Sequence, residues 1–404
     1  MHDSQPTSYL DRAHRLGQSV ERLKAGEAVQ TQIQVQSLED LKELLAGSLT
    51  AEQLEQGGKD LSPERLTHHS DAPYAPLADF VSYIYGSREL SAGEKNFAQD
   101  LFPVTVTVVS KAAMEVTTDI TYGPSAAPVL LNVGKLTFNG GSLTARNTVL
   151  TLNADVLAFG STTGKLPYHI GILGKDGEQG SQGAAGAAPS PAQATSGSNA
   201  KERSWGICTG VGNGGNGGNG AAGHSGTDGG MGKNGLPSLP ATITIGALDD
   251  ALPGSLVVFT RSGAGGRGGI GGAGGQGQQG GNGGNGCDSG CEGTDGGNAG
   301  SGGKGGKGGK GGQGGNAVNG FDTNLTVPVA MKNKVATSSE IAPFGEGGPG
   351  GGGGTGGEPG TKGAGGKGSS DGKPASKGDP GDNGDTGDKG TQQGAAGMIY
   401  VTYR

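Results

Sequence analysis

The sequence has few aromatic residues and no long apolar run. Aromatic residues make up 4% and apolar residues 31% of the 404 positions, so a conventional hydrophobic core can occupy only part of the chain. No apolar run approaches the roughly 18 residues that a transmembrane helix needs, and the N-terminus lacks the basic-then-apolar pattern of a signal peptide. We therefore expect no transmembrane segment and no classical signal peptide, and a protein that acts outside the cell or in a released particle.

Cysteine is also scarce. Cys208, Cys287 and Cys291 are too few for a disulfide framework. Cys208 could form a disulfide with either of the others after oxidation, and three free thiols in a reducing compartment are the alternative. The CxxxC spacing of Cys287 and Cys291 has no second pair, so we expect no metal site.

Sequence patterns of enzyme chemistry are missing as well. The stretch GNGGNG at 212–217 matches a dinucleotide fingerprint only because any repeat with glycine at every third position does so. No nucleophile elbow and no complete phosphate loop occurs. The net charge of −7 is modest for this length and gives no general attraction to nucleic acid. We expect no enzyme, no cofactor and no nucleic-acid partner.

Glycine is the abundant residue, with 90 copies, and from Gly174 onward it recurs at every third position. A period of three is that of the polyproline-II helix, which rises about 3.1 Å per residue and has no internal hydrogen bonds. Its backbone groups therefore need partners on neighbouring segments, and a glycine face lets those neighbours approach closely. The register is kept in six runs, at 174–186, 214–235, 265–286, 297–315, 348–366 and 378–390.

Six interrupted runs in one chain favour a self-contained antiparallel bundle. A collagen-like trimer is one alternative, although these runs contain few prolines, and outright disorder is another. Strand-like apolar segments at 240–260, 319–331 and 398–404 lie between or after the runs. We expect these segments to join a β-domain or to close one end of the bundle.

The first part of the chain has a different composition. Up to residue 101 apolar residues recur at helical spacing, and Ser91 with Glu94 has the spacing of a capping box. From 103 to 160 short β-branched segments alternate with Asn-Gly and Gly-Gly corners, which is typical of a solenoid or a small sandwich. The predicted fold is mixed: an α-helical domain at 1–101, a β-rich domain at 102–170, and a glycine-rich bundle of about six polyglycine-II helices at 171–404.

The glycine runs resemble the polyglycine-II bundle proteins, which include phage tail-fibre tip adhesins and a snow-flea antifreeze protein. The closing GAAGMIYVTYR, a glycine run that leads into a final strand, is similar to the end of many glycine-rich tail-fibre tips. The stretch VGKLTFNGGSLTARNTVLTLNADVLAFG, followed by HIGILGKDGEQG, also resembles a group of bacterial glycine-rich proteins. The likeness covers residues 125–404 and implies that the protein is a receptor-binding scaffold.

Residues that interrupt the repeat are the first candidates for binding, because loops on a rigid scaffold tolerate variation. The longest interruption, 189–210, contains the only tryptophan, Trp205, and Arg203 lies two positions before it. Aromatic and arginine side chains are preferred anchors at interfaces. The alternative is that Trp205 packs against the scaffold. A second interruption, 332–348, contains Phe344.

Two ladders of charge follow the period of three. One comprises Lys304, Lys307 and Lys310, and the other comprises the aspartates at 379, 382, 385 and 388. The lysine edge could bind an anionic glycan or lipopolysaccharide. The alternative is that the two ladders face each other, where exposed pairs contribute at most about 1 kcal/mol each.

We therefore expect a non-enzymatic adhesin that binds a cell-surface glycan or protein receptor. A secreted toxin-like protein, insecticidal or cell-targeting, with the N-terminal helices as its active part is the main alternative. Ice binding is a minor alternative, because the exposed repeat positions hold Lys, Asn, Gln and Asp rather than a ladder of Thr or Ala. Formation of a homo-oligomer through the N-terminal helices is a further alternative.

Overall fold

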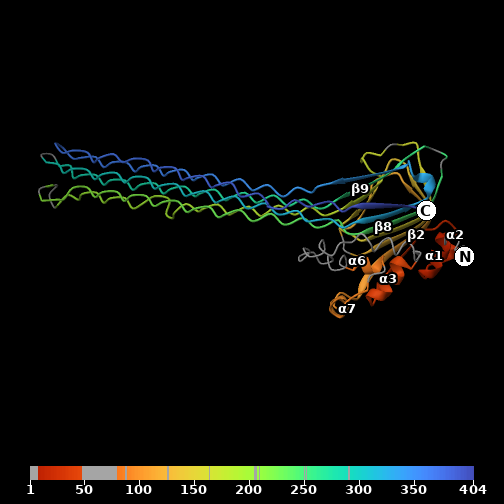
Figure 1. Ribbon diagram of the computed structural model, residues 1–404. Helices are drawn as coiled ribbons and strands as arrows, with labels where there is room; N and C mark the ends of the chain where they lie inside the picture. The colour runs from red at the N-terminus through yellow and green to blue at the C-terminus, as the bar shows by residue number, and fades with distance from the viewer. Residues whose placement is uncertain are drawn as a thin grey trace.

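The computed structural model describes residues 8–47 and 80–404, apart from 87–88, 125–126, 163, 204–206, 209, 250, 252 and 290–291. In this part of the chain a head of two β-sheets carries a long, narrow stalk (Figure 1). The first described helix and the last strand both lie in the head, so the far end of the stalk is the point most distant from them (Figure 1).

The two sheets of the head have seven and five strands, and all neighbouring strands are parallel except the first two of the larger sheet. The larger sheet has the order β1 (Val29–Val35), β2 (Val104–Val116), β4 (Val129–Phe138), β6 (Leu150–Phe159), β8 (Ala241–Leu248), β10 (Thr323–Val327) and β12 (Ile399–Tyr403). The smaller sheet has the order β3 (Ile120–Tyr122), β5 (Leu143–Arg146), β7 (Ile170–Leu173), β9 (Leu256–Arg261) and β11 (Val335–Glu340).

From β2 onward, successive strands along the chain alternate between the two sheets. The pleat of a β-strand points successive side chains to opposite faces, so one side chain in two faces the opposite sheet. Leu131, Leu152, Ile243 and Leu325 stand in register on neighbouring strands of the larger sheet and are buried in the core between the sheets. Full burial of a side chain of this size contributes about 1.5–3 kcal/mol, so these short strands are stable only as a stack.

Helices cover the outer face of the larger sheet near β1, β2 and β4 (Figure 1). Helix α3 (Leu38–Ala46) begins at Ser37, whose hydroxyl accepts the Asp40 N–H, and its buried residues pack in one cluster with Val106 and Val108 of β2. The expected capping box of Ser91 and Glu94 opens α7 (Ala92–Gln99). The other described helices are α1 (Tyr9–Arg15), α2 (Val20–Lys24), α6 (Val81–Ile84) and the short 3-10 helix η2 (Val329–Met331).

The stalk is formed by three long hairpins inserted at the same corner of the strand stack. From β5 the chain returns to the larger sheet through residues 147–149 alone. At the equivalent corners after β7, β9 and β11 the chain instead runs outward along the stalk and back before entering β8, β10 and β12. We call residues 174–240, 262–322 and 341–398 the first, second and third hairpin. Their outgoing arms continue the smaller sheet and their returning arms continue the larger one.

Backbone hydrogen bonds at every third residue hold the arms together. In the second hairpin the Gly308 N–H donates to the carbonyl of Asp382 and the Gly309 N–H to that of Gly272, both over 2.8 Å. A Cβ at Gly308 would overlap the carbonyl of Gly351, and one at Gly309 would overlap that of Thr227. Both glycines of this doublet are therefore required, because arms of the first and third hairpins flank the second.

The predicted fold class is wrong. The protein is dominated by two sheets, and β1 lies in the larger of them, so the N-terminal region is not an α-helical unit standing apart. The glycine runs do not form a polyglycine-II bundle that follows a β-domain, because they are insertions between strands of one head. They are not a collagen-like repeat either, since their partners lie in the same chain. The strands expected within 240–260, 319–331 and 398–404 do form and belong to the sheets.

Candidate functional site at the stalk tip

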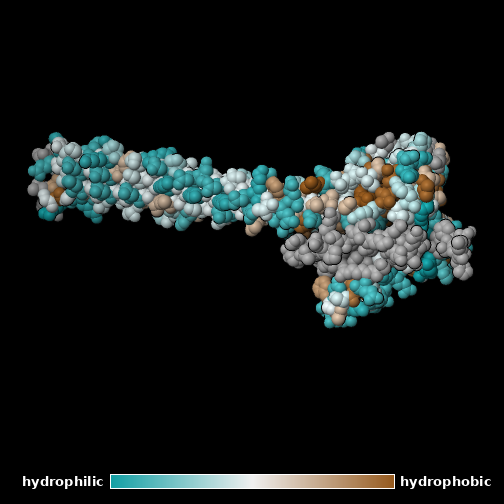
Figure 2. Space-filling view, in the orientation of Figure 1, coloured by the Kyte–Doolittle hydropathy of each residue, from teal (hydrophilic) through white to brown (hydrophobic). Residues whose placement is uncertain are grey.

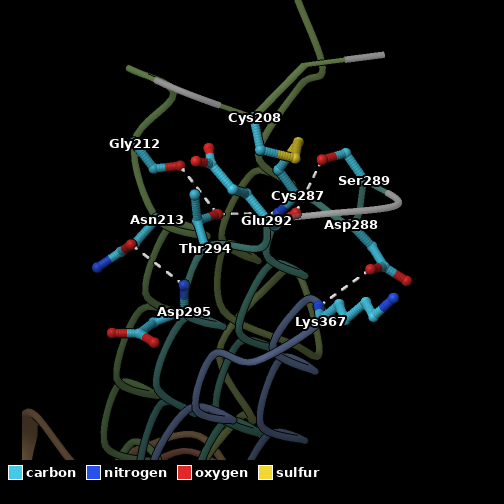
Figure 3. Close-up of a disulfide and its surroundings, with 10 residues drawn as sticks. All are labelled: Cys208, Gly212, Asn213, Cys287, Asp288, Ser289, Glu292, Thr294, Asp295 and Lys367. Atoms are coloured by element: carbon cyan, nitrogen blue, oxygen red, sulfur yellow. Dashed lines mark hydrogen bonds between the residues drawn. A yellow bond between two sulfur atoms is a disulfide. The ribbon is translucent and has the colours of Figure 1, made fainter.

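The three hairpins turn at the same end of the stalk and are tied together there (Figure 3). The turn of the second hairpin contacts the third through the Lys367 N–H, which donates to Asp288 Oδ1 over 3.0 Å. It contacts the first through the Asp295 N–H, which donates to Asn213 Oδ1 over 3.2 Å. The tip is therefore one surface built from turns that are far apart in the sequence.

A disulfide between Cys208 and Cys287 joins the first two turns (Figure 3). Both residues are buried, at 2% exposure, although the turns around them are largely exposed. The Cys287 N–H also donates to Thr294 Oγ1 over 2.9 Å, which connects the outgoing and returning arms of the second hairpin at its turn. Cys291 lies outside the described residues. The disulfide pairs residues 79 positions apart and so closes a loop that includes most of the first returning arm and the second outgoing arm.

Asparagine and aspartate side chains connect parallel arms along the stalk. Asn216 Oδ1 accepts the Asn298 N–H over 2.8 Å, and Asp228 Oδ1 accepts the Lys310 N–H over 2.7 Å. Asn298 Oδ1 in turn accepts the Lys373 N–H over 2.8 Å. These side-chain oxygens accept hydrogen bonds from backbone N–H groups of non-glycine positions, which do not take part in the hydrogen bonds donated by the glycines. The sequence reasoning missed this role, and its signal was the recurrence of Asn and Asp directly before glycine or alanine.

Arg203 holds a turn together at the tip. Its N–H donates to the Ile207 carbonyl, and its Nη2 donates to the Gly210 carbonyl, both over 3.1 Å. Trp205 lies outside the described residues. Ile207, which the sequence reasoning did not single out, is 48% exposed beside this turn. An apolar side chain this exposed in a polar turn is a candidate contact for a partner.

The lysine ladder lies along the stalk rather than at its tip. Lys304 Nζ lies 3.5 Å from Asp382 Oδ2, and Lys310 Nζ lies 3.0 Å from Asp388 Oδ2. The hydrogen bond to Asp388 raises the pKa of Lys310. Lys307 is exposed between them. The two ladders therefore face each other at these two pairs, which neutralises much of the positive edge.

Phe344 lies at the opposite end of the stalk from Arg203, where the third hairpin leaves the head. It is half-buried and its Cβ lies against the backbone of Gly390. The described residues among those singled out in the sequence thus occupy the tip, the shaft and the base, and they do not form one site. The shaft is mainly hydrophilic on the face that Figure 2 shows.

No family model, curated protein or solved structure matches this chain. The resemblance to polyglycine-II bundle proteins is therefore wrong as an assignment of family, since no family is matched and the sheets organise the fold. Among the described residues, no helix combines the length and apolar character needed to cross a membrane. In the same part of the chain, no cluster of His, Cys, Asp and Glu is placed to hold a metal ion.

Proposed function

We propose that the protein is a non-enzymatic adhesin or receptor-binding protein that presents the stalk tip to a glycan or protein on a cell surface. The convergence of three turns at the end of a long stalk carries this proposal. Turns on a rigid support can vary in sequence without disturbing the core, and they are the usual place for recognition. The hydrogen bonds and the disulfide between the turns reduce the entropy lost on binding.

The disulfide also supports action outside the cell. Bonds of this kind persist in oxidising compartments and are rare in a reducing cytosol. Cys208 and Cys287 are bonded at the end of the molecule that we propose meets the receptor. The alternative of a toxin-like protein stays a prediction, and so does a homo-oligomer through the N-terminal helices, because no described contact favours either.

The proposal is tested with single substitutions at the tip of the full-length protein. We expect Ile207→Ser and Lys367→Ala to weaken binding to intact cells or to a glycan array by about tenfold, the effect of losing one good anchor. Ile207 is 48% exposed and Lys367 is also exposed, so neither substitution should unfold the head.

The matched control is Lys389→Ala, which removes the same charge near the base of the stalk, where Lys389 pairs with Glu346. It should leave binding unchanged. Equal losses in Lys389→Ala and Lys367→Ala would show that recognition does not reside in the tip.

A further inference from the structure

A hollow of about 420 Å³ lies in the head, on the outer face of the larger sheet. Helix α1 forms one wall and helix α3 the other, while Leu130, Asn132 and Asn153 of β4 and β6 line its floor. This volume falls within the range of small-molecule sites in proteins, roughly 300–1,000 Å³. The hollow is at the opposite end of the molecule from the tip, so it is independent of the function proposed above.

The floor contains an amide that lines the hollow and has no hydrogen-bond partner among the described residues. Asn132 and Asn153 are in register on neighbouring strands. The Asn132 side chain is satisfied, since its Nδ2 donates to the Tyr9 carbonyl and to Ser110 Oγ, both over 2.8 Å, and its Oδ1 accepts from Arg12 Nε. Asn153 is only 6% exposed and its side chain makes no hydrogen bond to another described residue. Since Asn153 lines the hollow, a ligand there can satisfy both its donor and its acceptor.

The two walls carry opposite charges. Arg12 is already paired with Asp155 over 2.7 Å, whereas Arg15, one helical turn further along α1, makes no ion pair within the described residues. On the other wall Asp40 and Glu43 are also without an ion pair in that part of the chain. Arg15 and the carboxylates of Asp40 and Glu43 therefore line the same hollow, and among the described residues none of the three forms a salt bridge.

We propose that this hollow binds a short zwitterionic peptide with an apolar side chain. The Arg15 guanidinium would hold the peptide carboxylate, and Asp40 with Glu43 would hold its ammonium group. Asn153 would bond to the peptide amide, and Leu16 and Leu130 would contact the side chain. Two carboxylates against one free cation disfavour polyanionic ligands such as nucleotides, because like charges repel.

Binding of the dipeptide leucyl-leucine to the full-length protein, measured by calorimetry, tests the proposal. We expect N-acetyl-leucyl-leucine, which lacks the ammonium group, and leucyl-leucine amide, which lacks the carboxylate, to bind at least about tenfold more weakly, since each loses a charge-assisted hydrogen bond. Absence of measurable binding by leucyl-leucine, or equal binding by all three peptides, would overturn the proposal.

Substitutions in the two walls test which wall binds the carboxylate of the peptide and which binds its ammonium group. Arg15→Gln and the double change Asp40→Asn with Glu43→Gln should each weaken leucyl-leucine binding about tenfold or more, and Asn153→Ala should weaken it about threefold to tenfold. Arg22→Gln on α2 removes an exposed arginine outside the hollow and serves as the control, with unchanged binding expected. Arg15 and Asp40 are exposed, so their variants should keep the parent melting temperature. Variants that keep both that temperature and full affinity would refute the assignment.

Discussion

At the scale of single residues, the stalk depends on positions where the backbone of another arm occupies the place of a side chain. Gly351 is such a position, because a Cβ there would overlap the carbonyl of Gly272 on the neighbouring arm. The adjacent Gly352 has nothing within 4 Å of its Cβ position. Alanine at position 351 would therefore add a Cβ where another arm is packed, whereas alanine at position 352 would meet no other atom. Comparing the two substitutions separates the effect of close packing from that of backbone flexibility.

We expect Gly351→Ala to lower the free energy of unfolding by about 1–3 kcal/mol or more, the usual cost of an overpacked site. Gly352→Ala should change it by no more than about 0.5 kcal/mol in either direction. Guanidinium denaturation followed by circular dichroism measures both. Equal midpoints for the two variants would mean that the arms are not packed as described.

A second residue-scale prediction concerns His169 in the head. Its ring packs edge-on against Phe138 and Phe159, with ring centroids 5.1 and 5.3 Å away, and its Nδ1 accepts the Val257 N–H over 3.1 Å. Burial lowers the pKa of His169 below its ordinary value of 6.5. The folded protein therefore prefers the neutral ring, and the unfolded chain takes up the proton more readily.

The stability that His169 contributes is fully present above about pH 6.5 and is lost as the pH falls from 6.5 through the lowered pKa. We expect the melting temperature of the head to fall between pH 6.5 and 5. His169→Gln cannot titrate and should flatten this slope. An unchanged slope in the variant would assign the pH dependence to other groups.

At the scale of elements, the disulfide fastens the first and second hairpins at the end where no sheet holds them. Crosslinks over long loops typically contribute about 2–4 kcal/mol. We expect Cys208→Ser with Cys287→Ser to lower the melting temperature and to expose the tip to limited proteolysis, while the head resists. Cys291→Ser, which keeps the bond, is the control. Cleavage that begins in the head instead would contradict this division of stability.

Elements were partly predictable from the sequence. The strands within 240–260 and the helix that begins after Ser91 follow from local signals, namely apolar alternation and a capping box. The pairing of strands does not follow from such signals. Leu152 on β6 stands beside Ile243 on β8, with the whole first hairpin between them in the sequence. Reading the chain as successive domains therefore gave the wrong fold class.

The candidate site shows the same limit. The interruption of the glycine register at 189–210 was predicted to be a loop, but only its last part turns, where Arg203 bonds to Gly210. Before that turn the outgoing arm continues, since the N–H groups of Gly197 and Ala200 donate to carbonyls of the second hairpin. Nothing local indicated that Asp288 and Lys367 join the tip, because their contact spans 79 positions. The sequence did offer the alternative that the two ladders face each other, but the individual pairs, Lys304 with Asp382 and Lys310 with Asp388, depend on the register between two returning arms.

At the scale of the whole molecule, the architecture separates two tasks. The head buries the apolar core and contains the two chain ends that the structure describes, while the stalk carries three turns away from it (Figure 1). The shaft consists mainly of glycine, small or polar side chains and paired charges, and Met231 and Ile270 are apolar residues exposed along it. We infer that the shaft serves as a rigid spacer and that recognition is concentrated at the tip.

The central claim is tested most directly by replacing the three turns at 201–207, 288–292 and 367–370 together with short Gly-Asn turns and measuring binding to intact cells. The shaft glycines and both sheets remain intact, so the variant should keep the circular dichroism and cooperative melting of the parent. The account predicts that binding is lost while folding is retained. Retention of full binding by this folded variant would contradict it.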